Sequence, residues 1–214
     1  MERTLPIAKP RLRGVSHELA FYAALGAGAV LIALAPARAA WAAAVYAASL
    51  ATMLGVSALY HRPNWSPAPR RWLRRADHAA IFVLIAGTYT PFTLLLRERG
   101  PAMLALAWGG AAAGILQSLF WVHAPRPLVA ALYLAFGWAI VLFWPALHAT
   151  LGPAGIFFLA FGGLLYSAGA IVYAARRPDP APAVFGYHEI FHAFVVAAAV
   201  CHFGVVVGVI RAIR

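Results

Sequence analysis

Two histidines one helical turn apart offer the clearest chemical signal in this sequence. His188 and His192 open the last apolar run and are four positions apart. A helix would place both imidazoles on one face, because residues at i and i+4 are neighbours on its surface. That spacing suits two ligands of one metal ion. The pair alone is weak evidence, because capping and interfacial packing explain most such pairs.

Two further polar groups lie at the ends of other apolar runs. Ser57 and His61 are again four apart, near the end of the second run, and Asp77 precedes the third. Polar side chains inside membrane-spanning segments are costly, so they are functional candidates. His17 and Glu18, before the first run, could neighbour these groups, although capping or interfacial roles fit them better.

Seven apolar runs must position these residues. Each is long enough to cross a hydrocarbon core of about 30 Å at about 1.5 Å per residue. They are rich in Ala and Gly, as helices that pack closely in lipid tend to be. We expect an all-α membrane protein, with an N-terminal segment over 1–16 and a bundle of seven transmembrane helices over 17–214. The runs cover residues 19–37, 39–60, 79–96, 101–122, 127–147, 153–175 and 190–210.

Composition supports this class and disfavours others. The chain of 214 residues is 64% hydrophobic and 11% charged, whereas soluble domains carry about 25% charged residues. The net charge of +11 does not indicate nucleic acid, because the basic residues lie between apolar runs. The first run resembles a signal peptide, but its 19 residues exceed the usual 7–15, and we expect an uncleaved helix.

The distribution of Lys and Arg predicts an orientation. With seven spans, 12 of the 17 basic residues fall on the side of the N-terminus and 5 on the other side. The positive-inside rule then places the N-terminus in the cytoplasm and the C-terminus outside. His61, Asp77 and the pair His188/His192 would all lie at cytoplasmic helix ends.

Three neutral imidazoles with one open position are typical of a catalytic zinc site. Zn²⁺ there could acidify a water molecule and polarise a carbonyl group. Asp77 would then act on that water or orient a ligand, and Ser57 would be a neighbouring hydrogen-bond donor. The bland alternative is a set of unrelated interfacial polar residues.

Four segments of the chain carry specific motifs: RLRGVSHELAF (11–21), SALYHRP (57–63), RRADHAAIFVLIAGTYTPF (74–92) and FGYHEIFH (185–192). They resemble the hemolysin III family, the bacterial branch of the progestin and adipoQ receptors, which implies a multi-pass protein of a bacterial inner (plasma) membrane. The resemblance implies seven helices, a cytoplasmic N-terminus and a buried zinc near the cytoplasmic face. The zinc histidines of the family fall on His61, His188 and His192, and its Ser and Asp partners on Ser57 and Asp77.

Three functions follow as alternatives. The first is a ceramidase-like zinc hydrolase acting on a lipid amide or ester, as the resemblance implies. The second is a non-enzymatic protein, either a membrane-homeostasis sensor or a cytolytic factor, in which zinc is structural. The third is an intramembrane protease, because residues 188–192 match H-E-x-x-H, with Glu189 as general base. Membrane lipids are the expected partners in the first two.

Overall fold

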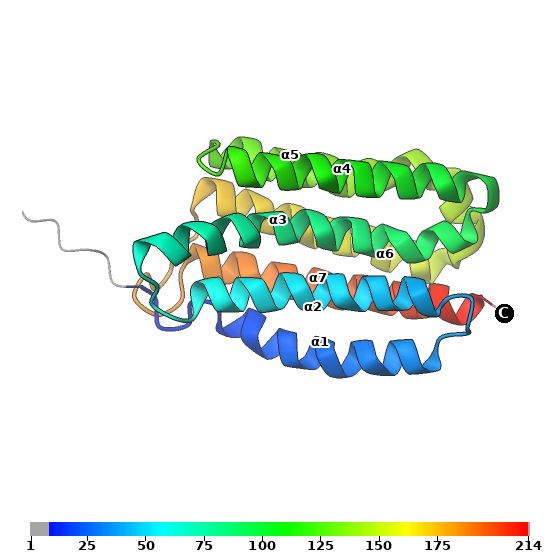
Figure 1. The fold of residues 1–214 in the computed structure, drawn as a ribbon, viewed down its shortest axis with the longest axis horizontal. Helices are drawn as coiled ribbons and strands as arrows, with labels where there is room; N and C mark the ends of the chain where they lie inside the picture. Colours follow the sequence, from blue (N-terminus) through cyan, green and yellow to red (C-terminus); the bar gives the residue numbers. More distant parts are fainter. Residues whose placement is uncertain (1–8, 214) are drawn as a thin grey trace, which may run out of the picture.

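The computed structural model describes residues 9–213, and within them the regular structure is helical. The helices pack lengthwise into one bundle (Figure 1). The α-helices are α1 Val15–Leu34, α2 Ala40–His61, α3 Pro67–Phe92, α4 Gly100–Phe120, α5 Arg126–Trp138, α6 Trp144–Ala175 and α7 Tyr187–Ala212. Short 3₁₀ helices cover η1 Thr93–Leu95, η2 Arg97–Arg99 and η3 Ala139–Phe143.

Within residues 9–213, six helical segments are long and apolar enough to span a membrane. Five of them are α1, α2, α3 with η1, α4 and α7, and the sixth is the continuous segment of 50 residues over 126–175. The expectation of a helical membrane protein is confirmed. The count of seven spans is not, because the expected fifth and sixth runs form that one segment.

The segment over 126–175 is irregular where two regular helices were expected. The α-helical part of α5 is only 13 residues long and continues as the 3₁₀ helix η3. Inside α6, Gly152 has φ 65° and ψ 172°, and Pro153 follows. A positive φ suits glycine, and proline has no N–H to continue the ladder, so the helix kinks here.

Tyr89 of α3 compensates the break between α5 and η3. Its hydroxyl accepts a hydrogen bond from the Ile140 N–H at 2.7 Å and lies 2.8 and 2.7 Å from the carbonyl oxygens of Phe136 and Gly137. Backbone groups freed by an irregular turn need partners where lipid excludes water. The buried Tyr89 side chain therefore provides hydrogen-bond partners for backbone groups at the irregular end of this short helix.

Helix α3 begins earlier than its apolar run. Hydropathy predicted a span from residue 79, with the preceding arginines in a loop, but α3 starts at Pro67. The basic first turns hide the helix from a hydropathy count, although Pro67 suits the first helical position. Arg70, Arg74 and Asp77 consequently lie on a helix, where spacings of four and three residues give them one face.

Glycines allow the helices to approach closely. A Cβ at Gly114 of α4 would lie 2.3 Å from the Phe82 ring of α3, and one at Gly28 of α1 would lie 2.9 Å from the Ala47 Cβ of α2. A Cβ at Gly109 of α4 would meet nothing within 4 Å. Small residues at such contacts are a common feature of membrane helix packing.

We predict that Gly114→Ala destabilises the bundle by about 1–3 kcal/mol, the usual cost of overpacking a buried contact. The matched control is Gly109→Ala on the same helix, which should be neutral or slightly stabilising, because alanine favours a helix by up to about 1 kcal/mol. Unfolding of the two purified variants in one detergent measures the difference. Equal stabilities would contradict the assigned α3–α4 contact.

Candidate metal centre

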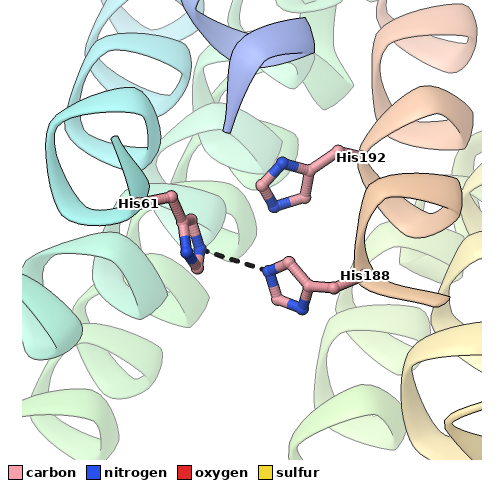
Figure 2. Close-up of side chains that lie close together, drawn as sticks. All are labelled: His61, His188 and His192. Carbon is pink, nitrogen blue, oxygen red and sulfur yellow. Dashed lines mark hydrogen bonds between the residues drawn. The ribbon is translucent and has the colours of Figure 1, made fainter. Parts of the chain in front are cut away.

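Three histidines from two helices converge at one end of the bundle (Figure 2). His61 is the last residue of α2, and His188 and His192 lie in the first two turns of α7. One ring nitrogen from each lies within 4.8 Å of the other two. Helix α2 ends, and α3 and α7 begin, at this end of the bundle, which we call "the site end".

The ring geometry fits a small divalent metal ion. The Nε2 atoms of His61 and His188 are 3.2 Å apart. Two ligands at about 2.0–2.1 Å with tetrahedral angles lie about 3.3 Å apart, so the separation of this pair is compatible with two ligands of one ion. It also suits the hydrogen bond between the two rings that Figure 2 marks. His61 and His192 are 8% and 2% exposed, and Nδ1 of His192 has no hydrogen-bond partner in the described part of the chain. Three buried histidines thus lie close enough to hold a metal ion.

The structure also brings Ser57 and Asp77 to this site. An Asp77 carboxylate oxygen lies 3.7 Å from His61 Nε2, too far for a hydrogen bond but within reach of a small molecule held between them. Ser57, one turn before His61, is buried, and its hydroxyl neighbours the Asp77 carboxyl group. All five residues singled out in the sequence therefore meet, although their chemical roles are still predictions.

His17, for which a capping or interfacial role was the preferred prediction, lies against the histidine cluster. Its ring stacks on His192 with centroids 3.8 Å apart and planes 5° from parallel, and it is 2% exposed. Neither ring nitrogen has a hydrogen-bond partner among residues 9–213. The available signal was topological, because the expected first helix starts at the same end as the expected last one.

Glu189 has a structural position. One carboxylate oxygen lies 2.5 Å from Arg13 Nε, and the other accepts a hydrogen bond from the Gly186 N–H at 2.8 Å. The Gly186 contact is the glutamate half of a capping box, and together with the Arg13 ion pair it fixes the start of α7. Both oxygens are occupied, so the H-E-x-x-H match does not supply the free general base that a protease needs.

A cavity of about 700 Å³ extends from the three histidines into the bundle. Its lining near the site end is polar and basic, and deeper it is apolar, with Ile81, Leu84, Ile140 and Leu159 among the contributors. Pockets for small molecules commonly have volumes of about 300–1,000 Å³. The candidate metal centre therefore opens onto a space large enough for an organic ligand.

We predict that His61→Ala, His188→Ala and His192→Ala each lose most of the bound metal. Removal of one of three ligands should leave well under one equivalent, measured by elemental analysis of the purified protein. The matched control is His148→Ala, whose side chain is exposed far from the site. Full metal content in the three variants, or its loss in the control, would contradict the site.

We also predict that His17→Ala weakens metal binding about tenfold, the lower end for residues that orient a ligand from outside the coordination shell. His17→Phe keeps a stacked ring without nitrogen and should retain most of the affinity. A competition titration with a chromogenic chelator measures both. Equal weakening by the two substitutions would show that the nitrogens of His17, not its stacking, support the site.

The chain is similar in sequence to proteins of one known family. Residues 5–203 match the model of the "Haemolysin-III related" family. The chain is 38% identical to "Hemolysin-3 homolog" of Bacillus subtilis (strain 168) over 129 residues, which is 59% of this chain and 58% of that protein. It is 35% identical to "Hemolysin-3" of Bacillus cereus over 162 residues, 74% of this chain and 70% of that protein.

A more distant relative comes from an animal. The chain is 30% identical to "Adiponectin receptor protein" of Drosophila melanogaster over 172 residues, which is 70% of this chain and 38% of that longer protein. The similarity to hemolysin III and adiponectin-receptor proteins inferred from the motifs is thus confirmed. Because the family model matches residues 5–203, nearly the whole chain, this multi-pass membrane protein belongs to the haemolysin-III related family.

Proposed function

We propose that this protein is a zinc-dependent hydrolase that cleaves an amide or ester bond of a membrane lipid. The single observation behind the proposal is the juxtaposition of three clustered histidines, the carboxylate of Asp77 and a large, mostly apolar cavity. Three imidazoles leave a coordination position open, as catalytic zinc sites do. Bound zinc would supply a Lewis acid that acidifies water and polarises a carbonyl group.

The protein residues would divide the remaining work. His61, His188 and His192 would hold the metal, and Asp77 would accept a proton from the attacking water and return it to the leaving group. Ser57 would orient the Asp77 carboxyl group, which it neighbours. The apolar part of the cavity would hold the acyl chain and exclude bulk water.

The same proposal includes a topology of seven spans, with the N-terminus in the cytoplasm of a bacterial inner membrane. Figure 1 supports it, because the chain runs along α5 toward the end where the C-terminus lies and returns along α6. Separate crossings by α5 and α6 give seven spans and opposite ends for the termini. The excess of Lys and Arg on the side of the N-terminus supports this orientation.

Labelling of single cysteines tests the topology. In a Cys201→Ser background, we predict that Thr150→Cys, in the part of α6 that precedes the Gly152 kink, reacts with a membrane-impermeant maleimide in cells whose outer membrane has been made permeable. Pro182→Cys, between α6 and α7, should react only after the inner membrane is opened. Both positions are exposed. Labelling of position 182 from outside would exclude the seven-span orientation.

A structural role for the metal is the second candidate. The observation that favours it is the position of the ligands, because a metal bound by His61 of α2 and His188 of α7 would join two helices that are far apart in sequence. A sensor of membrane state could use such a tie without catalysis. So could a cytolytic protein, the kind that the name "Hemolysin-3" suggests for the Bacillus cereus relative.

Asp77→Asn separates the two candidates. We predict that this isosteric variant keeps its metal and stability but loses turnover by about 10²–10⁴-fold, the usual contribution of a general acid–base group. The assay is release of fatty acid from a panel of N-acyl and ester lipids, with Asp179→Asn as a control outside the cavity. Unchanged turnover would refute the role of Asp77. Failure of the metal-loaded protein to hydrolyse any of the panel would favour the structural alternative.

A further inference from the structure

The mouth of the cavity carries far more positive than negative charge. Six basic side chains line it at the site end, whereas Asp77 is the one carboxylate in the lining among the described residues. The basic residues are Lys9, Arg13, Arg70, Arg71, Arg74 and Arg126. A low-dielectric cavity with this lining concentrates a positive potential that would attract anions.

The carboxylates elsewhere neutralise one of these six basic side chains, Arg13, and leave the other five without an ion-pair partner in the described residues. Glu189 pairs with Arg13, and Glu18 pairs with Arg62 at 2.6 Å, outside the cavity. Asp179 accepts a hydrogen bond from the Tyr187 N–H at 2.9 Å. Over residues 9–213, Arg70, Arg71, Arg74 and Arg126 have no ion-pair partner within 4.0 Å.

Aromatic side chains hold two of these guanidinium groups at the cavity wall. Arg126 lies over the Tyr173 ring, 5.7 Å from its centroid, and donates a hydrogen bond of 3.2 Å to the Tyr187 hydroxyl. Arg70 lies 5.2 Å from the centroid of the Tyr60 ring. Such contacts orient a guanidinium without neutralising it, so its charge remains available to a ligand.

The positive potential is also felt by Lys9. Burial lowers the pKa of its amine from the ordinary value, and the charges of Arg62 and Arg70 lower it further. Lys9 donates hydrogen bonds to the carbonyl oxygens of Arg62 and Pro63, at 2.7 and 3.3 Å, with no carboxylate within ion-pair distance in the described residues. The basic side chains at the mouth of the cavity thus repel one another, and a bound anion would reduce this repulsion.

Residues on one face of α3 give the cavity a basic, an acidic and an apolar zone, in that order along the helix. Arg70 and Arg74 come first, Asp77 follows, and Ile81 and Leu84 come last, all in the lining. At about 1.5 Å per residue, Arg74 precedes Asp77 by about 4.5 Å and Leu84 follows it by about 10.5 Å. A charged headgroup, a reacting bond and an apolar chain would meet these three zones in the same order.

We propose that the basic mouth of the cavity binds the phosphate group of a lipid whose acyl chain lies in the deeper, apolar part. The substrate class of the hydrolase is then a phosphate-bearing lipid, and that part of the inference rests on the function proposed above. Arginine forks bind phosphate oxygens in pairs. Several unpaired cations suit a phosphate monoester, with a charge of about −1.5 to −2, better than a carboxylate with a single charge.

Binding of three probes that share an oleoyl chain tests the headgroup site. The probes are oleoyl lysophosphatidic acid, monooleoylglycerol and oleic acid, each titrated into metal-loaded full-length protein in a neutral detergent and followed by native mass spectrometry. We expect the phosphate-bearing probe to bind at least tenfold more tightly than the other two. Equal affinities for it and monooleoylglycerol would overturn the proposal, and tightest binding of oleic acid would overturn the choice of phosphate.

Arginine variants localise the effect. Arg74→Gln and Arg126→Gln should each weaken binding of lysophosphatidic acid about tenfold and leave monooleoylglycerol unchanged. The matched control is Arg75→Gln, because Arg75 is outside the lining and donates to the Leu119 carbonyl oxygen of α4 at 2.9 Å. Should Arg74→Gln fail to fold, the exposed Arg70→Gln replaces it. Equal weakening by the control would show that only overall charge matters and would overturn the site.

The experiment separates this inference from the proposed hydrolysis. Binding that depends on phosphate and on Arg74, without turnover of any lipid, would support the headgroup site and contradict the hydrolase. Turnover of neutral lipids that is insensitive to Arg74→Gln and Arg126→Gln would support the hydrolase and contradict the headgroup site.

Discussion

Lipid offers no hydrogen bonds, and this constraint governs where every polar group of the protein can lie. Within the hydrocarbon region a backbone or side-chain polar atom must find its partner inside the bundle. The break between α5 and η3 shows the consequence, since the Tyr89 hydroxyl from α3 meets the Ile140 N–H that the irregular backbone leaves free. Ser118 and Thr88 likewise bond to carbonyl oxygens one turn earlier in their own helices, at 2.9 and 2.8 Å.

The same constraint explains why the histidine cluster lies inside and at one end. Imidazoles with unpartnered ring nitrogens would be unfavourable on a lipid-facing surface, whereas together they form a ligand set. Glycine contacts make the packing close in some places, such as α1 against α2 and α3 against α4. Elsewhere the helices leave space for the cavity, which is lined by residues of α1, α2, α3, α5, α6 and α7. The bundle is thus closely packed at the glycine contacts and open around the cavity.

Charge follows a different logic from packing. The few carboxylates mostly anchor the structure, with Glu189 fixing the start of α7 and Glu18 binding Arg62 of the segment after α2. The N-terminal segment is held by backbone hydrogen bonds from Arg11 and Leu12 to residues 183 and 184. Because these carboxylates are engaged elsewhere, Arg70, Arg71, Arg74 and Arg126 line the cavity without an ion-pair partner in the described part of the chain. The candidate site therefore combines a neutral, buried ligand set with a cationic mouth.

The sequence by itself determined the membrane class, the helical content and the pairing of His188 with His192 on one face, because composition and helical period are local properties. The alternating direction of successive spans also predicted that His61, Ser57 and Asp77 lie at the same end of the bundle as this pair. The stacking of His17 on His192, the capping role of Glu189 and the early start of α3 required the tertiary structure. So did the short α5 and the cavity. These features depend on distances between helices, which are set by side-chain packing among segments remote in sequence.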